Sequence, residues 1–93
     1  MSAASVELNL RASDFTGTKK VLVPSVHAET TVRELTQGLL RRMGLVREDV
    51  GGRPLEWQMR LEREGRHLND SELVVDALQP QDEIRVLPKI HAA

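Results

Sequence analysis

The sequence predicts an α+β domain in which a mixed sheet of four to five strands packs on one α-helix. One strongly amphipathic helix lies near the middle of the chain, and short segments of alternating apolar and polar residues flank it on both sides. No second segment has a helical pattern of comparable strength. Because a helix with one apolar stripe must pack against another layer, a sheet has to cover it.

The helix is predicted over residues 31–45, and both of its ends are marked. Thr31 followed by Glu34 matches a capping box, in which each side chain accepts a hydrogen bond from the other residue's backbone amide. Gly44 suits the left-handed conformation in which many helices end. The apolar residues recur at the three-and-four spacing of one helix face: Val32, Leu35, Leu39, Leu40 and Met43.

Two strands are expected to precede the helix as a hairpin. Alternation over residues 6–11 indicates a first strand with one solvated face, and residues 13–18 are typical of a turn. Residues 19–23 indicate the second strand. Pro24 is expected to end it, because proline has no amide to donate to the ladder.

Two questions about this hairpin stay open in the sequence. Val21 and Val23 alternate with Leu22, so either set of side chains can face the core. Phe15 lies in the predicted turn, where it either contacts a partner or folds back onto the core.

Shorter elements are predicted after the helix. Residues 46–55 form a loop, and residues 57–62 form a third strand with Trp57 and Met59 in the core. A very short strand follows at residues 66–68 after a glycine turn.

The end of the chain is predicted to hold a helical turn and the last strand. Residues 71–78 form the helical turn, with Ser71 as its cap. Residues 83–87 form the strand, and Pro88 is expected to end its pairing. In this strand Ile84 and Val86 point inward, while Arg85 and Leu87 point outward.

Length and composition exclude several classes of function. A chain of 93 residues corresponds to one domain, and a net charge of −1 gives no field that would attract nucleic acid. Without cysteine, disulfides and thiolate chemistry are excluded. The three histidines lack the spacing of metal ligands, so neither a metal nor a cofactor is expected: His27, His67 and His91.

The sequence also predicts that the protein is not an enzyme and is soluble and cytoplasmic. It contains no phosphate-binding glycine motif, no serine elbow and no cysteine nucleophile. The first residues have neither a basic start nor an apolar run, so they do not resemble a signal peptide, and no segment is long and apolar enough to span a bilayer.

The order of the predicted elements resembles the β-grasp fold, and the residues resemble ubiquitin over nearly the whole chain. The matching segments are Thr31-Val32 at the helix start, Gln58-Met59-Arg60-Leu61 in the third strand, Gly65-Arg66-His67-Leu68-Asn69-Asp70 after it, and residues 73–76 and 82–87 near the end. The resemblance implies a mixed sheet that wraps one helix, with the first and last strands central and parallel. It also implies a ubiquitin-like domain over residues 1–88 and a C-terminal tail over residues 89–93.

The chain departs from ubiquitin on the exposed sheet face. Ubiquitin presents an apolar patch there, whereas the matching position in this chain is Glu62, with Arg60 beside it and Arg85 and Leu87 on the last strand. These four residues form the predicted partner-binding face, and Lys20 or Leu22 of the second strand is a candidate extension of it. A solvated face without a partner is the alternative.

The chain also departs from ubiquitin at its end, where Ala92-Ala93 replaces the Gly-Gly of that family. The resemblance still implies a modifier of a bacterial ubiquitination-like pathway. Its tail is activated, conjugated and released by partner enzymes: Lys89, Ile90, His91, Ala92 and Ala93. The alternative is an unconjugated adaptor or regulator that binds through its sheet face, like the β-grasp proteins of type VII secretion loci. A frayed terminus is the remaining interpretation of the tail.

Overall fold

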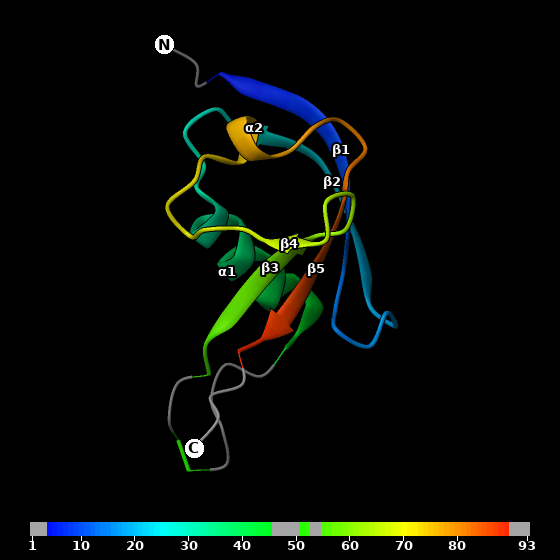
Figure 1. The fold of residues 1–93 in the computed structure, drawn as a ribbon, viewed down its shortest axis with the longest axis vertical. Coiled ribbons are helices and arrows are strands. Elements are labelled where there is room, and N and C mark those ends of the chain that lie inside the picture. The colour runs from blue at the N-terminus through cyan, green and yellow to red at the C-terminus, as the bar shows by residue number, and fades with distance from the viewer. Residues whose placement is uncertain (1–3, 46–50, 53–54, 90–93) are drawn as a thin grey trace.

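A computed structural model describes residues 4–45, 51–52 and 55–89 as one sheet with one main helix (Figure 1). The elements in chain order are β1 (Ser5–Ser13), β2 (Lys20–His27), α1 (Val32–Met43), β3 (Trp57–Leu61), β4 (Arg66–His67), α2 (Val74–Ala77) and β5 (Glu83–Pro88). The sheet order is β2-β1-β5-β3-β4. β1 and β5 are parallel, and the other neighbours are antiparallel. This topology confirms the predicted α+β class and the β-grasp arrangement.

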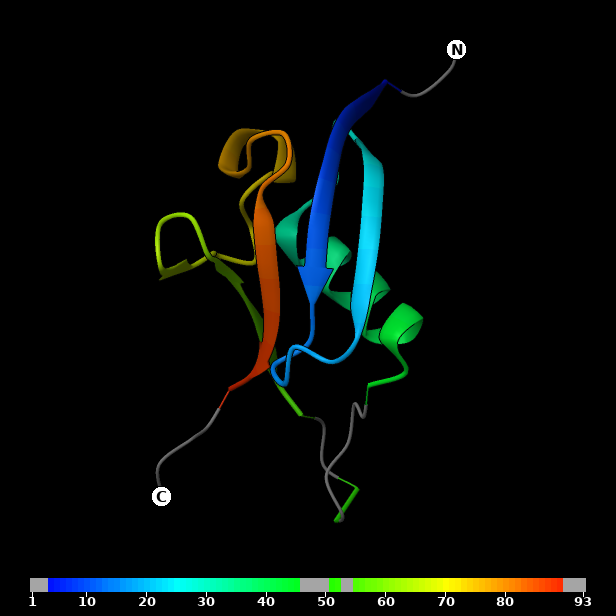
Figure 2. The same cartoon turned by 90° about the vertical axis from the view of Figure 1, so that its right-hand side faces the viewer.

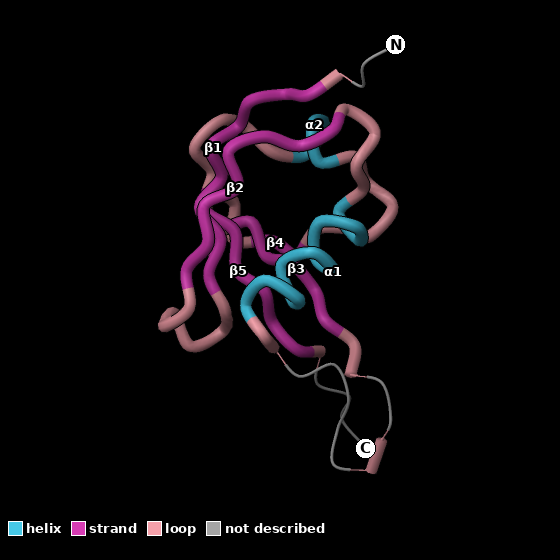
Figure 3. Tube along the Cα trace, turned by 180° about the vertical axis from the view of Figure 1, so that it is seen from behind, coloured by secondary structure: helices cyan, strands magenta, loops and turns pink. Residues whose placement is uncertain are grey.

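The sheet curves around α1, which lies on one of its faces (Figures 2 and 3). Alternate residues of β1, β3 and β5 are buried on the side of the helix, where they meet the apolar stripe of α1. The largest fully buried side chains come from the sheet and α1, with Val74 added from α2: Leu10, Leu39, Leu40, Met59, Leu61, Ile84, Val32, Val74 and Val86. The core is therefore a two-layer contact between one helix and one sheet face, as the helix pattern requires.

Both ends of α1 are capped as the sequence predicts. The Thr31 hydroxyl accepts from the Glu34 amide at 3.2 Å, and the Glu34 carboxylate accepts from the Thr31 amide at 3.0 Å. Gly44 ends the helix with φ of 65°, and the Leu45 amide donates to the Leu40 carbonyl at 3.0 Å. The C-terminus gains a cation as well, because Lys19 Nζ donates to the Met43 carbonyl at 2.9 Å.

The prediction that Pro24 ends the second strand is wrong, because β2 continues to His27. β2 is an edge strand, where a missing amide costs no ladder hydrogen bond on the outer side. The register also shifts here between Glu7 and Leu10, so that Leu8 and Asn9 of β1 lie opposite Pro24. Asn9 has a φ of 49°, as expected for the extra residue of a bulge.

The same register settles which side of β2 faces the core. Val23 is buried and Val21 is partly buried, whereas Leu22 points away and keeps 55% of its surface exposed. Phe15 is 46% exposed, but its ring centroid lies 6.1 Å from that of Trp57, so it packs against the rim of the core.

Two predictions near the end of the chain need correction. The residue that precedes α2 is Leu73, with no side-chain cap, so Ser71 does not cap it; instead Thr31 and Leu73 form an isolated bridge. Pro88 does not end the pairing of the last strand, since it lies opposite Trp57. Pairing continues one residue further, because the Lys89 amide donates to the Glu56 carbonyl at 2.7 Å.

Most of the predicted loop over residues 46–55 and the tail residues Ile90–Ala93 lie outside the described residues. In the described part of the chain the longest helix is α1, whose 12 residues are too few and too polar to traverse a bilayer.

Candidate partner-binding site

The sheet face turned away from α1, called the outer face below, brings basic residues of several strands into one row. Strand register aligns Lys20, Ser13, Arg85, Arg60 and His67 across β2, β1, β5, β3 and β4. Side chains directly opposite each other across neighbouring strands lie on the same face. Because Ala12, Ile84 and Leu61 of the next row are buried against the helix, this row points outward.

Glu62 lies between the two arginines of that row. Its carboxylate is 3.5 Å from Arg60 Nε and 3.2 Å from Arg85 Nε. The three side chains are 31–42% exposed. Both Nε groups are shielded from solvent and have no hydrogen-bond partner of good geometry in the described part of the chain. The single carboxylate of Glu62 therefore forms an ion pair with both guanidinium groups but accepts a hydrogen bond of good geometry from neither Nε.

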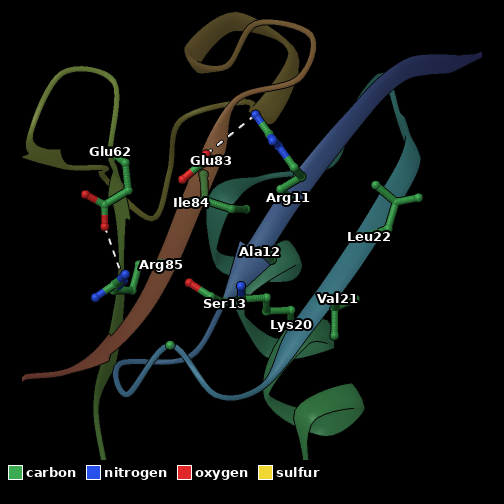
Figure 4. Close-up of a pocket in the computed structure, with 11 residues that line it drawn as sticks. Arg11, Ala12, Ser13, Lys20, Val21, Leu22, Glu62, Glu83, Ile84 and Arg85 are labelled. Carbon is green, nitrogen blue, oxygen red and sulfur yellow. Dashed lines mark ion pairs between the residues drawn. The ribbon is translucent and has the colours of Figure 1, made fainter.

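A shallow depression of about 620 Å³ opens beside this trio (Figure 4). It extends over β1, β2 and β5, where Leu22 forms its apolar border and Lys20 lies near the hairpin turn. Arg11 and Glu83, paired across the parallel strands at 3.5 Å, close another side. Ser13 and Arg85 contribute to the middle.

All four residues of the predicted binding face lie on this outer face. Arg60, Glu62 and Arg85 touch one another through the two ion pairs. Leu87 follows Arg85 by two residues on β5 and lies opposite Gln58, partly buried. Leu87 is not among the residues of the depression.

The predicted tail lies mostly outside the described residues, and two residues of the outer face were not predicted. Among the predicted tail residues, Lys89 is bound to the sheet and the other four lie outside the described residues. Arg11 and Glu83 were not predicted as site residues. The sequence indicates them only indirectly, because both lie at outward positions of the two strands that the resemblance to ubiquitin implies are parallel neighbours.

Two buried carboxylates serve the fold and not the site. Asp14 accepts from the Thr16 hydroxyl and the Lys19 amide, which orders the β1–β2 turn. Asp82 accepts two hydrogen bonds from Arg63 and one from the Gln79 amide. Burial alone would raise the pKa of each carboxyl, but these hydrogen bonds outweigh it and hold both pKa values below the ordinary 3.8.

No group of three or more histidine, aspartate or glutamate side chains suited to hold a metal occurs within residues 4–45, 51–52 and 55–89. The residues around the depression instead include separated cations, the carboxylates of Glu62 and Glu83, and the exposed side chain of Leu22. Such a mixture suits a polar protein interface.

No protein-family model matches this chain, and no curated protein sequence matches it either. Solved structures do match. One is a chain of the toluene 4-monooxygenase HD complex with the inhibitor 4-bromobenzoate, with a TM-score of 0.68 and 15% identity, covering 90% of this chain and 100% of that chain.

Two further matching structures are described by their ubiquitin-like domain or by their mimicry of SUMO. The N-terminal ubiquitin-like domain of the 4931431F19Rik protein gives a TM-score of 0.64 at 8% identity, over 100% of this chain and 85% of that one. A chain from a structure described as molecular mimicry of SUMO in the promotion of DNA repair gives 0.60 at 19% identity, over 85% and 88%. At identities this low, the likeness establishes a ubiquitin-like fold and nothing further.

Proposed function

We propose that this chain is a ubiquitin-like adaptor or regulator, not an enzyme, and that partner proteins bind it through the outer face. The observation that carries the proposal is the placement of Arg60 and Arg85 around the single carboxylate of Glu62. Charged groups that are incompletely paired on an open sheet face are available to a partner, and they favour specificity over tight burial.

A non-enzymatic role is part of the same proposal. Asp14 and Asp82, the two buried carboxylates of the described residues, accept hydrogen bonds that hold turns together. Their pKa values are lowered, which makes them poor proton donors or acceptors near neutral pH. Perturbed acids and bases at an active site are usually shifted toward the working pH. The outer face offers recognition chemistry in place of proton transfer.

A ubiquitin-like modifier is the second candidate. It rests on the resemblance and on the residues that follow β5, the strand that the ubiquitin-like arrangement places next to β1. In this form the segment Lys89–Ala93 is gripped by an activating enzyme, its carboxylate is adenylated, and the chain is transferred to a target. Alanine at the last two positions adds two methyl groups where glycine allows close backbone approach.

One experiment separates the two candidates. The tagged protein is cross-linked in extract of its own cells, and bound proteins are identified by mass spectrometry for three forms: the unaltered chain, the double variant Arg60→Ala with Arg85→Ala, and a chain truncated after Lys89. The adaptor proposal expects the double variant to lose a partner that the truncated chain retains. Loss with truncation alone, together with an ATP-dependent adduct of the unaltered chain, would replace it with the modifier.

A further inference from the structure

The outer face carries an excess of positive charge that the chain as a whole lacks. Only two carboxylates, those of Glu62 and Glu83, line the described part of the depression, and the net charge of the chain is −1. Four cations lie on or beside the depression: Arg11, Lys20, Arg60 and Arg85. Both carboxylates already form ion pairs with arginines, so the remaining positive charge around the depression is exposed to solvent.

The individual groups are incompletely used. In the described part of the chain the Arg60 and Arg85 guanidinium groups contact no acceptor other than Glu62, and neither contact is a hydrogen bond of good geometry. An arginine beside a carboxylate in fork geometry makes two parallel hydrogen bonds, so each guanidinium keeps donors for a second anion. The residues around the depression therefore offer more cationic donors than carboxylates to accept from them.

We infer that the depression binds an extended acidic segment of a partner protein, with its carboxylates on Arg85 and Lys20 and an aliphatic side chain on Leu22; this rests on the proposed function. In an extended peptide, alternate side chains point the same way about 6.8 Å apart. The same spacing separates Leu22 from Lys20 along β2, and Arg85 lies two strands away through Ser13. A leucine and the glutamate two residues after it fit the spacing of Leu22 and Lys20, and a further glutamate is bound by the long side chain of Arg85, which lies to the side of that line.

The face favours a peptide over nucleic acid. Leu22 is 55% exposed at the border of the depression and offers an apolar contact that a phosphodiester backbone does not use. Glu62 and Glu83 repel a continuous row of phosphates but tolerate spaced carboxylates. Among the described residues, no aromatic side chain lines the depression to stack on a base.

The test uses the full chain labelled with ¹⁵N and the capped peptide Ser-Leu-Ser-Glu-Ser-Glu-Ser, followed by NMR titration. We expect amide shifts at Ser13, Lys20 and Arg85 and a salt-sensitive Kd. Arg85→Gln should raise Kd by about tenfold, because a charge-assisted contact is lost. Arg33→Gln is the matched control, since Arg33 is exposed on α1, and it should leave Kd unchanged.

Glu62→Gln should change the peptide affinity in the opposite direction to Arg85→Gln. Removing the competing carboxylate frees both guanidinium groups, so the acidic peptide should bind about three times more tightly. Equal binding of the peptide with glutamine in place of both glutamates, or equally tight binding of a single-stranded oligonucleotide, would overturn the inference. If the peptide fails while a native partner still requires Arg60 and Arg85, the inference alone fails; if no partner requires the outer face, the proposed function fails.

Discussion

The carboxylate of Asp82 accepts two hydrogen bonds from the guanidinium of Arg63, at 2.9 Å from Nε and 3.2 Å from Nη2. Asp82 is 6% exposed and also accepts from the Gln79 amide at 2.8 Å. Arg63 follows β3 and Asp82 precedes β5, so this pair joins the turns at one end of two neighbouring strands. The pair fixes the approach of β5 to the sheet.

We predict that Asp82→Ala lowers the free energy of unfolding by roughly 2–3 kcal/mol, because a buried acceptor of charged and backbone donors is lost. Urea denaturation followed by the fluorescence of Trp57, the single tryptophan, measures the change. Asp70→Ala is the control, since Asp70 is exposed, and it should leave the midpoint within experimental error. Equal midpoints for both variants would contradict a structural role for the pair.

Acid should destabilise the fold through Asp14 and Asp82. The pKa of each is lowered in the folded state, so the unfolded chain binds more protons as the pH falls. Their contribution is complete above about pH 5 and is lost progressively below it, as the pH passes the ordinary value and then the folded value. Thermal unfolding between pH 7 and pH 2.5 should show this fall, and Asp14→Asn with Asp82→Asn should flatten it. If the double variant still loses stability steeply at low pH, other groups cause that loss and the prediction is wrong.

Two glycines of α1 and its cap should respond to alanine in opposite directions. A Cβ added at Gly44 or at Gly38 meets nothing within 4 Å, so packing is not the cause of either effect. Gly44→Ala should cost about 1 kcal/mol, because a φ of 65° strains any L-residue with a side chain. Gly38→Ala should stabilise by about 0.5–1 kcal/mol, because alanine loses less backbone entropy within the helix. Equal shifts in the thermal midpoint would contradict the cap assignment.

Sequence patterns sufficed for the helix and for most strands, because one periodicity or one capping pair defines each of them. Thr31, Glu34 and Gly44 lie within one segment, so local chemistry alone located both ends of α1. Trp57 and Met59 alternate clearly with polar neighbours, and β3 begins at the predicted residue, although it ends at Leu61, one residue before the predicted end.

The remainder depended on contacts that sequence alone does not show. Pro24 was misjudged because its tolerance follows from the edge position of β2 and from the bulge at Leu8 and Asn9. The depression was not foreseen because it needs the register of β2, which three consecutive apolar residues left ambiguous. The Arg63–Asp82 pair joins residues 19 positions apart, and no local pattern announces it.

Binding of partners to the outer face can be measured by site-selective alkylation, because the chain has no native cysteine. Leu22→Cys places one thiol on the outer face, and Arg33→Cys places one on exposed α1. With a saturating amount of the partner identified by cross-linking, we expect alkylation to slow at least tenfold at position 22 and to be unchanged at position 33. Protection at position 33 with free reaction at position 22 would contradict it.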